Sequence, residues 1–314
     1  MFTLKDLCKF VGCKDMLLVE AEVKSLQTNS RLCDAHSVFV PIKGVHVNGL
    51  DYLKNAQEQG ALAALVSKDN QPTAEQLAGV SMPIIYMPHH ASFYDQVATW
   101  LCEEPSHKLR LIGITGTNGK STITSLISQW LSLITGAKAG LLGTLGYGFL
   151  PHLHKSANTT LDAISLQQVL GDMVKEGATY AAMEVSSIGV CEGRISGCKF
   201  AAGGFTNLTR DHLDYHKTME NYAKAKKAFL DLVPPERLVI NIDDETGAKF
   251  ASDYDNCIVV SRKLKADDPK FSRFKRYVIA TDVVYKQDGL HIKFDTFMGK
   301  GEADFKLMGT FNIE

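Results

Sequence analysis

Short unbroken apolar runs recur along the 314-residue chain, separated by segments in which apolar residues follow helical spacing. Such runs are typical of buried strands, and apolar residues three and four apart are typical of helices that cover a sheet. The alternation predicts an α/β fold with a mostly parallel sheet flanked by helices. Strands are predicted at 37–42, 61–66, 83–87, 109–114, 138–145 and 180–184 and ending at 205–208, with helices at 52–59, 121–133, 162–174 and 220–230.

The pattern also predicts two domains. A charged, proline-containing segment at 103–108 is suited to a domain boundary, so residues 1–106 form an N-terminal α/β domain and residues 107–314 a central one. Residues 276–305 alternate apolar and polar positions around Gln287-Asp288-Gly289. This hairpin signal predicts a small antiparallel sheet within the central domain.

Composition and charge narrow the class of protein. With 45% hydrophobic and 22% charged residues and a formal net charge of −1, the chain carries no global field for nucleic acid or an anionic membrane. No apolar stretch approaches the roughly 20 residues that span a bilayer, and residues 1–15 contain no uninterrupted apolar run. We therefore expect a monomeric cytoplasmic enzyme with neither nucleic-acid binding nor membrane insertion.

Cysteine and histidine spacing gives no metal or disulfide framework. The seven cysteines are scattered without CxxC pairs, which favours reduced thiols, several of them buried. His89, His90, His152 and His154 have no cysteine or carboxylate partners at ligand spacing, so exposed loop positions are predicted for them.

A glycine loop follows the strand at 109–114 and precedes the helix that begins at Ser121. Its glycines let backbone N–H groups turn toward phosphate oxygens, Lys120 reaches the terminal phosphates, and the Ser121 hydroxyl can hold Mg²⁺. The pattern GxxxxGK[ST] is not fully met, because Ile114 takes the place of its first glycine and Gly113 lies one residue early. The alternative is a glycine-rich turn with a chance lysine. The predicted ATP-binding residues are Gly116, Thr117, Asn118, Gly119, Lys120, Ser121 and Thr122.

A second chemical centre is predicted at Glu184. An apolar run ends in this residue, which places a carboxylate at the C-terminal edge of a strand, where open α/β sheets bind ligands. That placement suits a Mg²⁺ ligand. Further on, Lys224 and Lys227 of the helix at 220–230 are predicted to form a solvated face.

Motifs along essentially the whole chain resemble the Mur ligases, the ATP-dependent ligases of peptidoglycan precursor synthesis. Within that family they resemble the branch that adds the third amino acid of the peptide. The motifs are Thr28-Asn29-Ser30-Arg31 with Asn48-Gly49, the phosphate loop, Asn158-Thr159-Thr160, MEVSS at 183–187 with Arg194 after it, and FTNLTRDHLDYHKTMENYAKAK at 205–226.

The resemblance implies a uridine-nucleotide-binding N-terminal domain, a P-loop-type ATP-binding central domain, and a role for each motif residue. Catalytic groups would be Lys120, Lys226 and His212. Lys226 would be carbamylated by CO₂ and would hold a second Mg²⁺ with His212, while Ser121 and Glu184 hold the first. The substrate would be UDP-MurNAc-L-Ala-D-Glu, joined to meso-diaminopimelate or L-lysine through an acyl phosphate. Its predicted contacts are Ser30 for the uracil-diphosphate and Asn158, Thr159, Thr160, Ser186 and Arg194 for the sugar and peptide.

The chain departs from the family pattern at several positions. Asn29 and Asn48 stand for aspartates, Leu161 for proline, Ile188 for histidine and Glu192 for glutamine. Residues 307–314 resemble the stretch that closes the family's central domain, so the C-terminal ligase domain is expected to be absent and ligation to be weak. Two alternatives remain open: a folylpolyglutamate synthetase-like ligase, and a degenerate, non-catalytic substrate-binding protein.

Overall fold

The computed structural model describes residues 2–13, 20–44, 47–156, 158–265, 268, 273–307 and 309. It confirms the predicted α/β class, and the chain divides into two compact units. Unit 1 consists of Met1–Pro105 with Asp162–Asp172 and Gly193–Gly197, and unit 2 holds the rest. The predicted family stretch at 307–314 lies mostly outside the described residues.

Unit 1 contains a parallel sheet that is four-stranded as far as the chain is described, in the order β3-β4-β5-β6. Its buried apolar residues form one cluster with α1 and α3 and another with α2. The predicted strands and the helix after residue 52 are confirmed. The elements are β1 (Phe2–Thr3), α1 (Leu4–Val11), β2 (Glu22–Val23), β3 (Ser25–Gln27), β4 (Ser37–Phe39), α2 (Leu53–Glu58), β5 (Ala63–Ser67), β6 (Ile84–Met87) and α3 (Tyr94–Leu101), followed by α4 (Pro105–Lys108) at the unit boundary.

The two asparagines that replace aspartate in the family pattern both cap a short 3₁₀ helix. The Asn29 side chain accepts a hydrogen bond from Arg31 N at the start of Ser30–Leu32. Asn48 accepts one from Leu50 N at the start of Gly49–Tyr52. Asparagine caps helices about as well as aspartate, so these departures keep the local structure.

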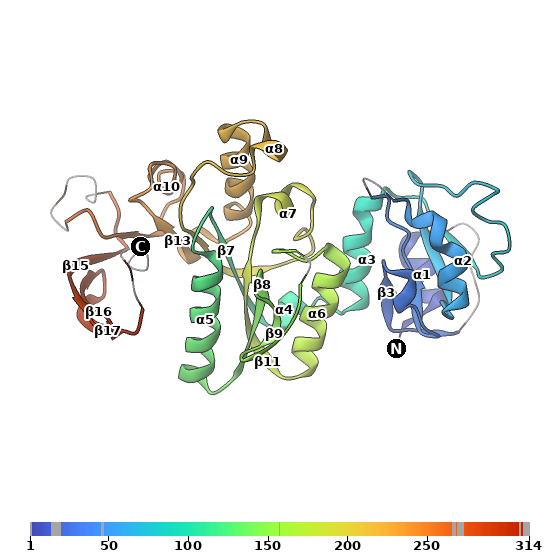
Figure 1. Cartoon of the computed structure of the whole chain (residues 1–314), viewed down its shortest axis with the longest axis horizontal. Coiled ribbons are helices and arrows are strands. Elements are labelled where there is room, and N and C mark those ends of the chain that lie inside the picture. The colour runs from blue at the N-terminus through green and yellow to red at the C-terminus, as the bar shows by residue number, and fades with distance from the viewer. Residues whose placement is uncertain are drawn as a thin grey trace. The chain divides into compact units, whose positions relative to one another are not determined.

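Unit 2 is built on one large sheet, several strands of which are labelled in Figure 1. Within the described ranges this sheet has eleven strands, in the order β10-β9-β8-β11-β7-β12-β13-β14-β15-β16-β17. Strands β8 to β15 in that order run parallel. The strands are β7 (Arg110–Thr115), β8 (Lys138–Gly143), β9 (Gly146–Phe149), β10 (His152–His154), β11 (Ala178–Glu184), β12 (Phe200–Phe205), β13 (Leu238–Asn241), β14 (Ile258–Ser261), β15 (Tyr277–Lys286), β16 (Gly289–Thr296) and β17 (Gly299–Phe305).

Antiparallel hairpins extend this sheet at both edges. The predicted hairpin around 287–289 is confirmed by β15 and β16, and β17 adds a third strand. The β9–β10 hairpin was not predicted, because its glycine-rich sequence indicates a turn. His152 and His154 are exposed but lie in β10, so the predicted loop position is wrong for them.

Helices of unit 2 connect the parallel strands. They are α5 (Lys120–Thr135), α7 (Ser187–Cys191), α8 (Leu213–His216), α9 (Met219–Leu230) and α10 (Glu245–Ala251), whereas α6 (Ala163–Lys175) belongs to unit 1 up to Asp172 and ends in unit 2. None of the helices in the described part of the chain combines the length and apolar character that crossing a membrane requires. The seven cysteines, all in the described part of the chain, are thiols rather than disulfides, and Cys8, Cys33 and Cys257 are buried.

Candidate active site at the carboxyl edge of the sheet

Four neighbouring parallel strands, β8, β11, β7 and β12, end at the same edge of the unit 2 sheet. Residues that follow these strands therefore meet there, although they are far apart in sequence. Thr144 follows β8, Glu184 ends β11, Gly116 follows β7 and Thr206 follows β12. Most of the predicted phosphate and metal residues lie in this cluster.

The phosphate loop leaves β7 at Gly116 and enters α5 at Lys120. Gly116 has φ 144° and Gly119 has φ 85°, a region that favours glycine. A Cβ at Gly116 would overlap the hydroxyl of Thr206, so no larger residue fits there.

Residues after β12 hold the loop in shape. The Asn207 carbonyl accepts from Thr117 N at 2.8 Å, and its side-chain oxygen accepts from Asn118 N at 3.0 Å. The Thr206 hydroxyl donates to the Asn118 carbonyl at 2.7 Å. The loop is thus a shaped backbone turn at a helix N-terminus, as an anion site requires.

Lys120 curls back over this loop. Its Nζ donates to the carbonyls of Gly116 and Thr117, each at 2.9 Å. Burial lowers the pKa of Lys120, while the charges of Glu184 and Asp211 act in the opposite direction. A half-buried cation therefore lies at the loop, where it can meet a terminal phosphate.

Glu184 is 2% exposed and organises the oxygen ligands beside the loop. It accepts a hydrogen bond from Ser121 Oγ at 2.8 Å and another from Thr144 N at 2.8 Å. A Cβ at Gly143 would overlap the Glu184 carboxylate, so the glycine before Thr144 makes room for it. A carboxylate and a hydroxyl at a helix N-terminus fit Mg²⁺, which prefers few protein oxygens and keeps several waters.

Lys226 is 1% exposed, although the lysines on either side of it in the helix are not buried. Its Nζ donates to the Gly116 carbonyl at 2.7 Å and lies 4.5 Å from the centre of the Tyr222 ring. Burial, with repulsion from Lys120, lowers the pKa of Lys226 to about 7. The predicted solvated face holds for Lys224, whereas Lys227 pairs with Asp231 at 3.0 Å.

His212 precedes α8 with φ 52° and lies edge-on to the Tyr222 ring at 6.0 Å. Two residues predicted for a second ion, His212 and Lys226, thus surround the same ring. Among the described residues, no three His, Cys, Asp or Glu side chains form a group that could hold a metal. A second ion would therefore need a further oxygen ligand.

The predicted peptide-binding threonines lie beside Glu184. Thr160 is buried, donates to the Glu184 carbonyl at 2.9 Å and accepts from Ser186 N at 2.9 Å. The Thr159 and Thr144 hydroxyls are 3.1 Å apart. Asp162 accepts a hydrogen bond from Ser165 N at 3.0 Å and caps α6.

The remaining predicted residues occupy separate places. Thr122 and Asn158 are exposed, and Ser186 Oγ caps α7 by accepting from Gly189 N. Ser30, 5% exposed, begins a 3₁₀ helix of unit 1, and Arg194 belongs to the Gly193–Gly197 segment of that unit.

Sequence reasoning missed several residues of this site. Five residues without an assigned role contact the loop, Glu184 or the Tyr222 ring. They are Thr144, Thr206, Asn207, Tyr222 and His216. The available signal was that Thr144, Thr206 and Asn207 lie at the ends of predicted strands. Without the strand order, that signal does not show which strand ends are neighbours.

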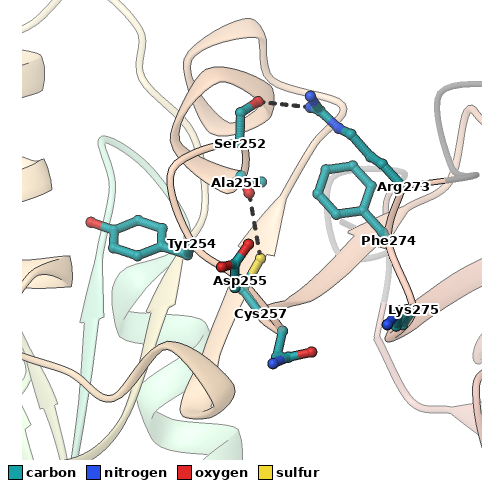
Figure 2. Close-up of a pocket in the computed structure, with 9 residues that line it drawn as sticks. Ala251, Ser252, Tyr254, Asp255, Cys257, Arg273, Phe274 and Lys275 are labelled. Carbon is teal, nitrogen blue, oxygen red and sulfur yellow. Dashed lines mark hydrogen bonds between the residues drawn. The ribbon is translucent and has the colours of Figure 1, made fainter.

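A separate cavity of about 400 Å³ lies at the opposite edge of the sheet (Figure 2), near the end of α10 and the starts of β14 and β15. Arg273 reaches across it to donate to Ser252 Oγ at 2.7 Å. None of the predicted site residues lines this cavity.

A strand, a glycine turn at a helix N-terminus and a carboxylate on the adjacent strand define an α/β protein with a P-loop-type site. A family profile described as "Mur ligase middle domain" matches residues 114–314, and one described as "Mur ligase family, catalytic domain" matches residues 22–99. The chain belongs to the Mur ligase family.

Individual relatives agree with this. A protein of Vibrio vulnificus (strain YJ016) named UDP-N-acetylmuramoyl-L-alanyl-D-glutamate--2,6-diaminopimelate ligase is 40% identical over 307 residues, which cover 98% of this chain and 60% of the relative. A solved structure with the same enzyme name is 26% identical with TM-score 0.72, covering 100% of this chain and 61% of that one. The chain thus spans about 60% of the length of the relative it matches. A solved L. casei FPGS, 13% identical with TM-score 0.55 over 72% of this chain and 60% of that one, shares the fold alone.

Proposed function

We propose that this chain provides the substrate- and nucleotide-binding units of an ATP-dependent amide ligase of peptidoglycan precursor synthesis. The reaction would add meso-diaminopimelate or L-lysine to UDP-MurNAc-L-Ala-D-Glu. The observation that carries the proposal is the Ser121–Glu184 pair beside the phosphate loop, with the peptide-binding threonines next to it. The name of the 40% identical relative supports the choice of substrate.

In the first step, a substrate carboxylate would attack the terminal phosphorus of ATP, break its bond to the bridging oxygen, and form an acyl phosphate with release of ADP. The loop N–H groups and the N-terminus of α5 would bind the phosphates, and Lys120 would neutralise the charge that moves during transfer. Mg²⁺ held by Ser121 and Glu184 would polarise the transferred phosphoryl group. The amine of the incoming amino acid would then attack the acyl carbon, releasing phosphate.

We further propose that Lys226 is carbamylated. An amine attacks CO₂ only when it is neutral, and a pKa of about 7 leaves a substantial neutral fraction at neutral pH. The nitrogen of the neutral amine would bond to the carbon of CO₂ and release one proton, which converts the neutral amine into an anion with two oxygens. Such a carbamate would supply the missing hard ligand for a second Mg²⁺ beside His212.

The sugar-peptide substrate would contact Ser30, Asn158, Thr159, Thr160, Ser186 and Arg194. The test is a calorimetric titration of this chain with UDP-MurNAc-L-Ala-D-Glu, comparing the wild type with a Ser30→Ala/Arg194→Ala variant. We expect saturable binding in the wild type that the variant loses. A Ser252→Ala/Arg273→Ala variant, which removes the same side-chain types at the cavity of Figure 2, is the matched control and keeps binding.

A folded sample that binds Mg-ATP but not the UDP-sugar would contradict the substrate assignment, and saturable folate binding would favour the folylpolyglutamate synthetase-like alternative. ATP turnover by the protein that the natural gene encodes, measured with the UDP-sugar and the amino acid both present, separates a ligase from a non-catalytic binding protein.

A further inference from the structure

Tyr222 connects α9 to the phosphate loop. It is 1% exposed, and its phenol oxygen lies 3.2 Å from Thr117 Oγ1. Thr117 Oγ1 also accepts from Thr209 N at 3.0 Å and lies 3.3 Å from the Thr209 carbonyl. A threonine hydroxyl donates once, so when it donates to Thr209 the Tyr222 hydroxyl donates to it.

The Tyr222 ring also contacts three other side chains of the site, those of His216, Lys226 and His212. The His216 ring stacks on it with centroids 5.0 Å apart and an interplanar angle of 27°. Lys226 Nζ lies 4.5 Å from its centre, and His212 approaches its edge at 6.0 Å. A single side chain therefore contacts the loop and both residues proposed for the second ion.

His216 carries the connection further. Its Nε2 lies 2.8 Å from Ser187 Oγ, and these two residues are 5% and 1% exposed. Ser187 begins α7 directly after Ser186, whose N–H donates to Thr160 Oγ1. A chain of buried contacts thus runs from the segment proposed to bind the sugar-peptide substrate to the phosphate loop.

We propose that Tyr222 and His216 are positioning residues that couple the sugar-peptide segment to the phosphate loop, so that the two substrates bind cooperatively. This coupling rests on the function proposed above. Packing alone does not require the Tyr222 hydroxyl, because phenylalanine fills nearly the same volume. The hydroxyl matters because its partner is a residue of the phosphate loop.

The first arm of the test measures nucleotide binding alone. In calorimetry with Mg²⁺ and a non-hydrolysable ATP analogue, Tyr222→Phe should bind roughly fivefold more weakly, as expected for one lost hydrogen bond. Tyr254→Phe is the matched control, since its hydroxyl bonds to Asp231 at 2.6 Å, outside the site. The control should match the wild type within about twofold. Equal affinities of the Tyr222→Phe variant and the wild type would overturn the positioning role.

The second arm measures cooperativity as the ratio of nucleotide affinities with and without saturating UDP-MurNAc-L-Ala-D-Glu. The wild-type ratio should fall within roughly 5 to 150, the usual range of coupling between sites. His216→Gln and Ser187→Ala should each bring the ratio close to one, and the milder serine variant keeps the test valid if the buried histidine variant fails to fold.

The outcomes separate the two proposals. Binding of both ligands with a wild-type ratio of one overturns the coupling and leaves the proposed function intact. Binding of nucleotide without binding of the UDP-sugar overturns the proposed function and the coupling, while the first arm still decides whether Tyr222 positions the loop.

Discussion

At the scale of single residues, two ammonium groups meet at one backbone carbonyl. Lys120 and Lys226 both donate to the Gly116 carbonyl, at 2.9 and 2.7 Å. Like charges this close disfavour each other's charged form, and burial adds to the effect. The effect is larger for Lys226, because this lysine is the more deeply buried, and its pKa falls to about 7.

The depressed pKa of Lys226 predicts how stability depends on pH. The unfolded lysine titrates at its ordinary 10.5 and the folded one at about 7, so between these values the unfolded chain binds more protons. The free energy of unfolding should therefore rise with pH in this window, by up to about 1.4 kcal/mol per pH unit. Chemical denaturation of wild type and Lys226→Met in CO₂-free buffers measures it.

The matched comparison is the slope between pH 7 and pH 9. Lys226→Met should show a flatter dependence than wild type, while Lys224→Met, which changes an exposed lysine two residues away, should keep the wild-type slope. Identical slopes in all three proteins would show that the folded Lys226 titrates as an ordinary lysine.

Glu184 is the residue whose charge the proposed Mg²⁺ site requires. Glu184→Gln keeps the size and an acceptor for Ser121 Oγ but removes the negative charge. We expect Mg²⁺-dependent nucleotide affinity to fall by roughly 10- to 100-fold, in line with charge-assisted contacts. Glu176→Gln, at an exposed glutamate paired with Lys138, is the control and should bind as wild type. Titrating Mg²⁺ at fixed nucleotide distinguishes a lost metal site from general unfolding.

At the scale of elements, β7 explains why the phosphate-loop pattern is irregular. A Cβ at Gly113 would lie 2.5 Å from the Phe229 ring and 2.9 Å from that of Phe200. The glycine one residue early therefore serves the packing of α9 and β12 against β7, and Ile114 is still part of the strand. The glycines that shape the loop are Gly116 and Gly119.

Because Gly113 packs in the core and does not shape the phosphate loop, its replacement should lower stability without directly changing the loop. Gly113→Ala should lower the free energy of unfolding by about 1 to 3 kcal/mol, as overpacked cores do. Gly79→Ala is the control, because a Cβ there meets no neighbouring atom and only the positive φ is unfavourable. Its free energy of unfolding should fall by less than that of Gly113→Ala. Urea denaturation measures both, and a Gly113→Ala variant as stable as wild type would mean that the two rings move aside freely.

The apolar spacing of helix α5 predicts that the helix forms but not which of its faces is buried. The apolar spacing correctly predicted the helix, but its buried residues are Thr124 and Ser128, whereas Trp130, Leu133 and Ile134 are exposed. Ser128 donates to the Ala139 carbonyl of β8, so hydrogen bonding holds this face to the sheet. A spacing rule finds the helix, while the face that packs depends on neighbours the pattern does not contain.

The same limit applies to the site. The phosphate loop and Glu184 could be predicted, since each is a local pattern at a strand end. Thr144 could not, because its contact with Glu184 depends on β8 lying next to β11, and strand order is set by long-range packing. Tyr222 was visible only as a member of a family motif, without its partner Thr117.

At the scale of the whole molecule, unit 1 is assembled from separate parts of the chain. Ile164 of α6 is 2% exposed and belongs to the same buried cluster as Leu26, and Gln168 donates to the Leu26 carbonyl at 2.7 Å. A linear cut after residue 105 would remove these contacts, which a contiguous N-terminal domain does not anticipate.

We therefore expect a fragment of residues 1–105 to unfold at a lower temperature than the same unit in the whole chain. Fluorescence of Trp100, which belongs to this unit, reports the transition in both samples when Trp130 of the whole chain is replaced by phenylalanine. In the whole chain, Ile164→Ala should lower the midpoint, whereas Ile134→Ala, at an exposed position on α5, should not. A fragment as stable as the intact unit would show that the inserted segments contribute little.

The carbonyl shared by Lys120 and Lys226 has a practical consequence for solution work. In CO₂-free buffer below about pH 7, where Lys226 is an uncarbamylated ammonium, two cations lie at one turn of a nearly neutral protein and attract small anions. Sulfate and inorganic phosphate should then compete with nucleotide for this turn. The dissociation constant of the nucleotide measured in a sulfate or phosphate buffer would then include the displacement of a bound buffer anion. Chloride or acetate buffers at matched ionic strength give the intrinsic value, and the difference between the two sets measures how strongly the paired lysines attract simple anions.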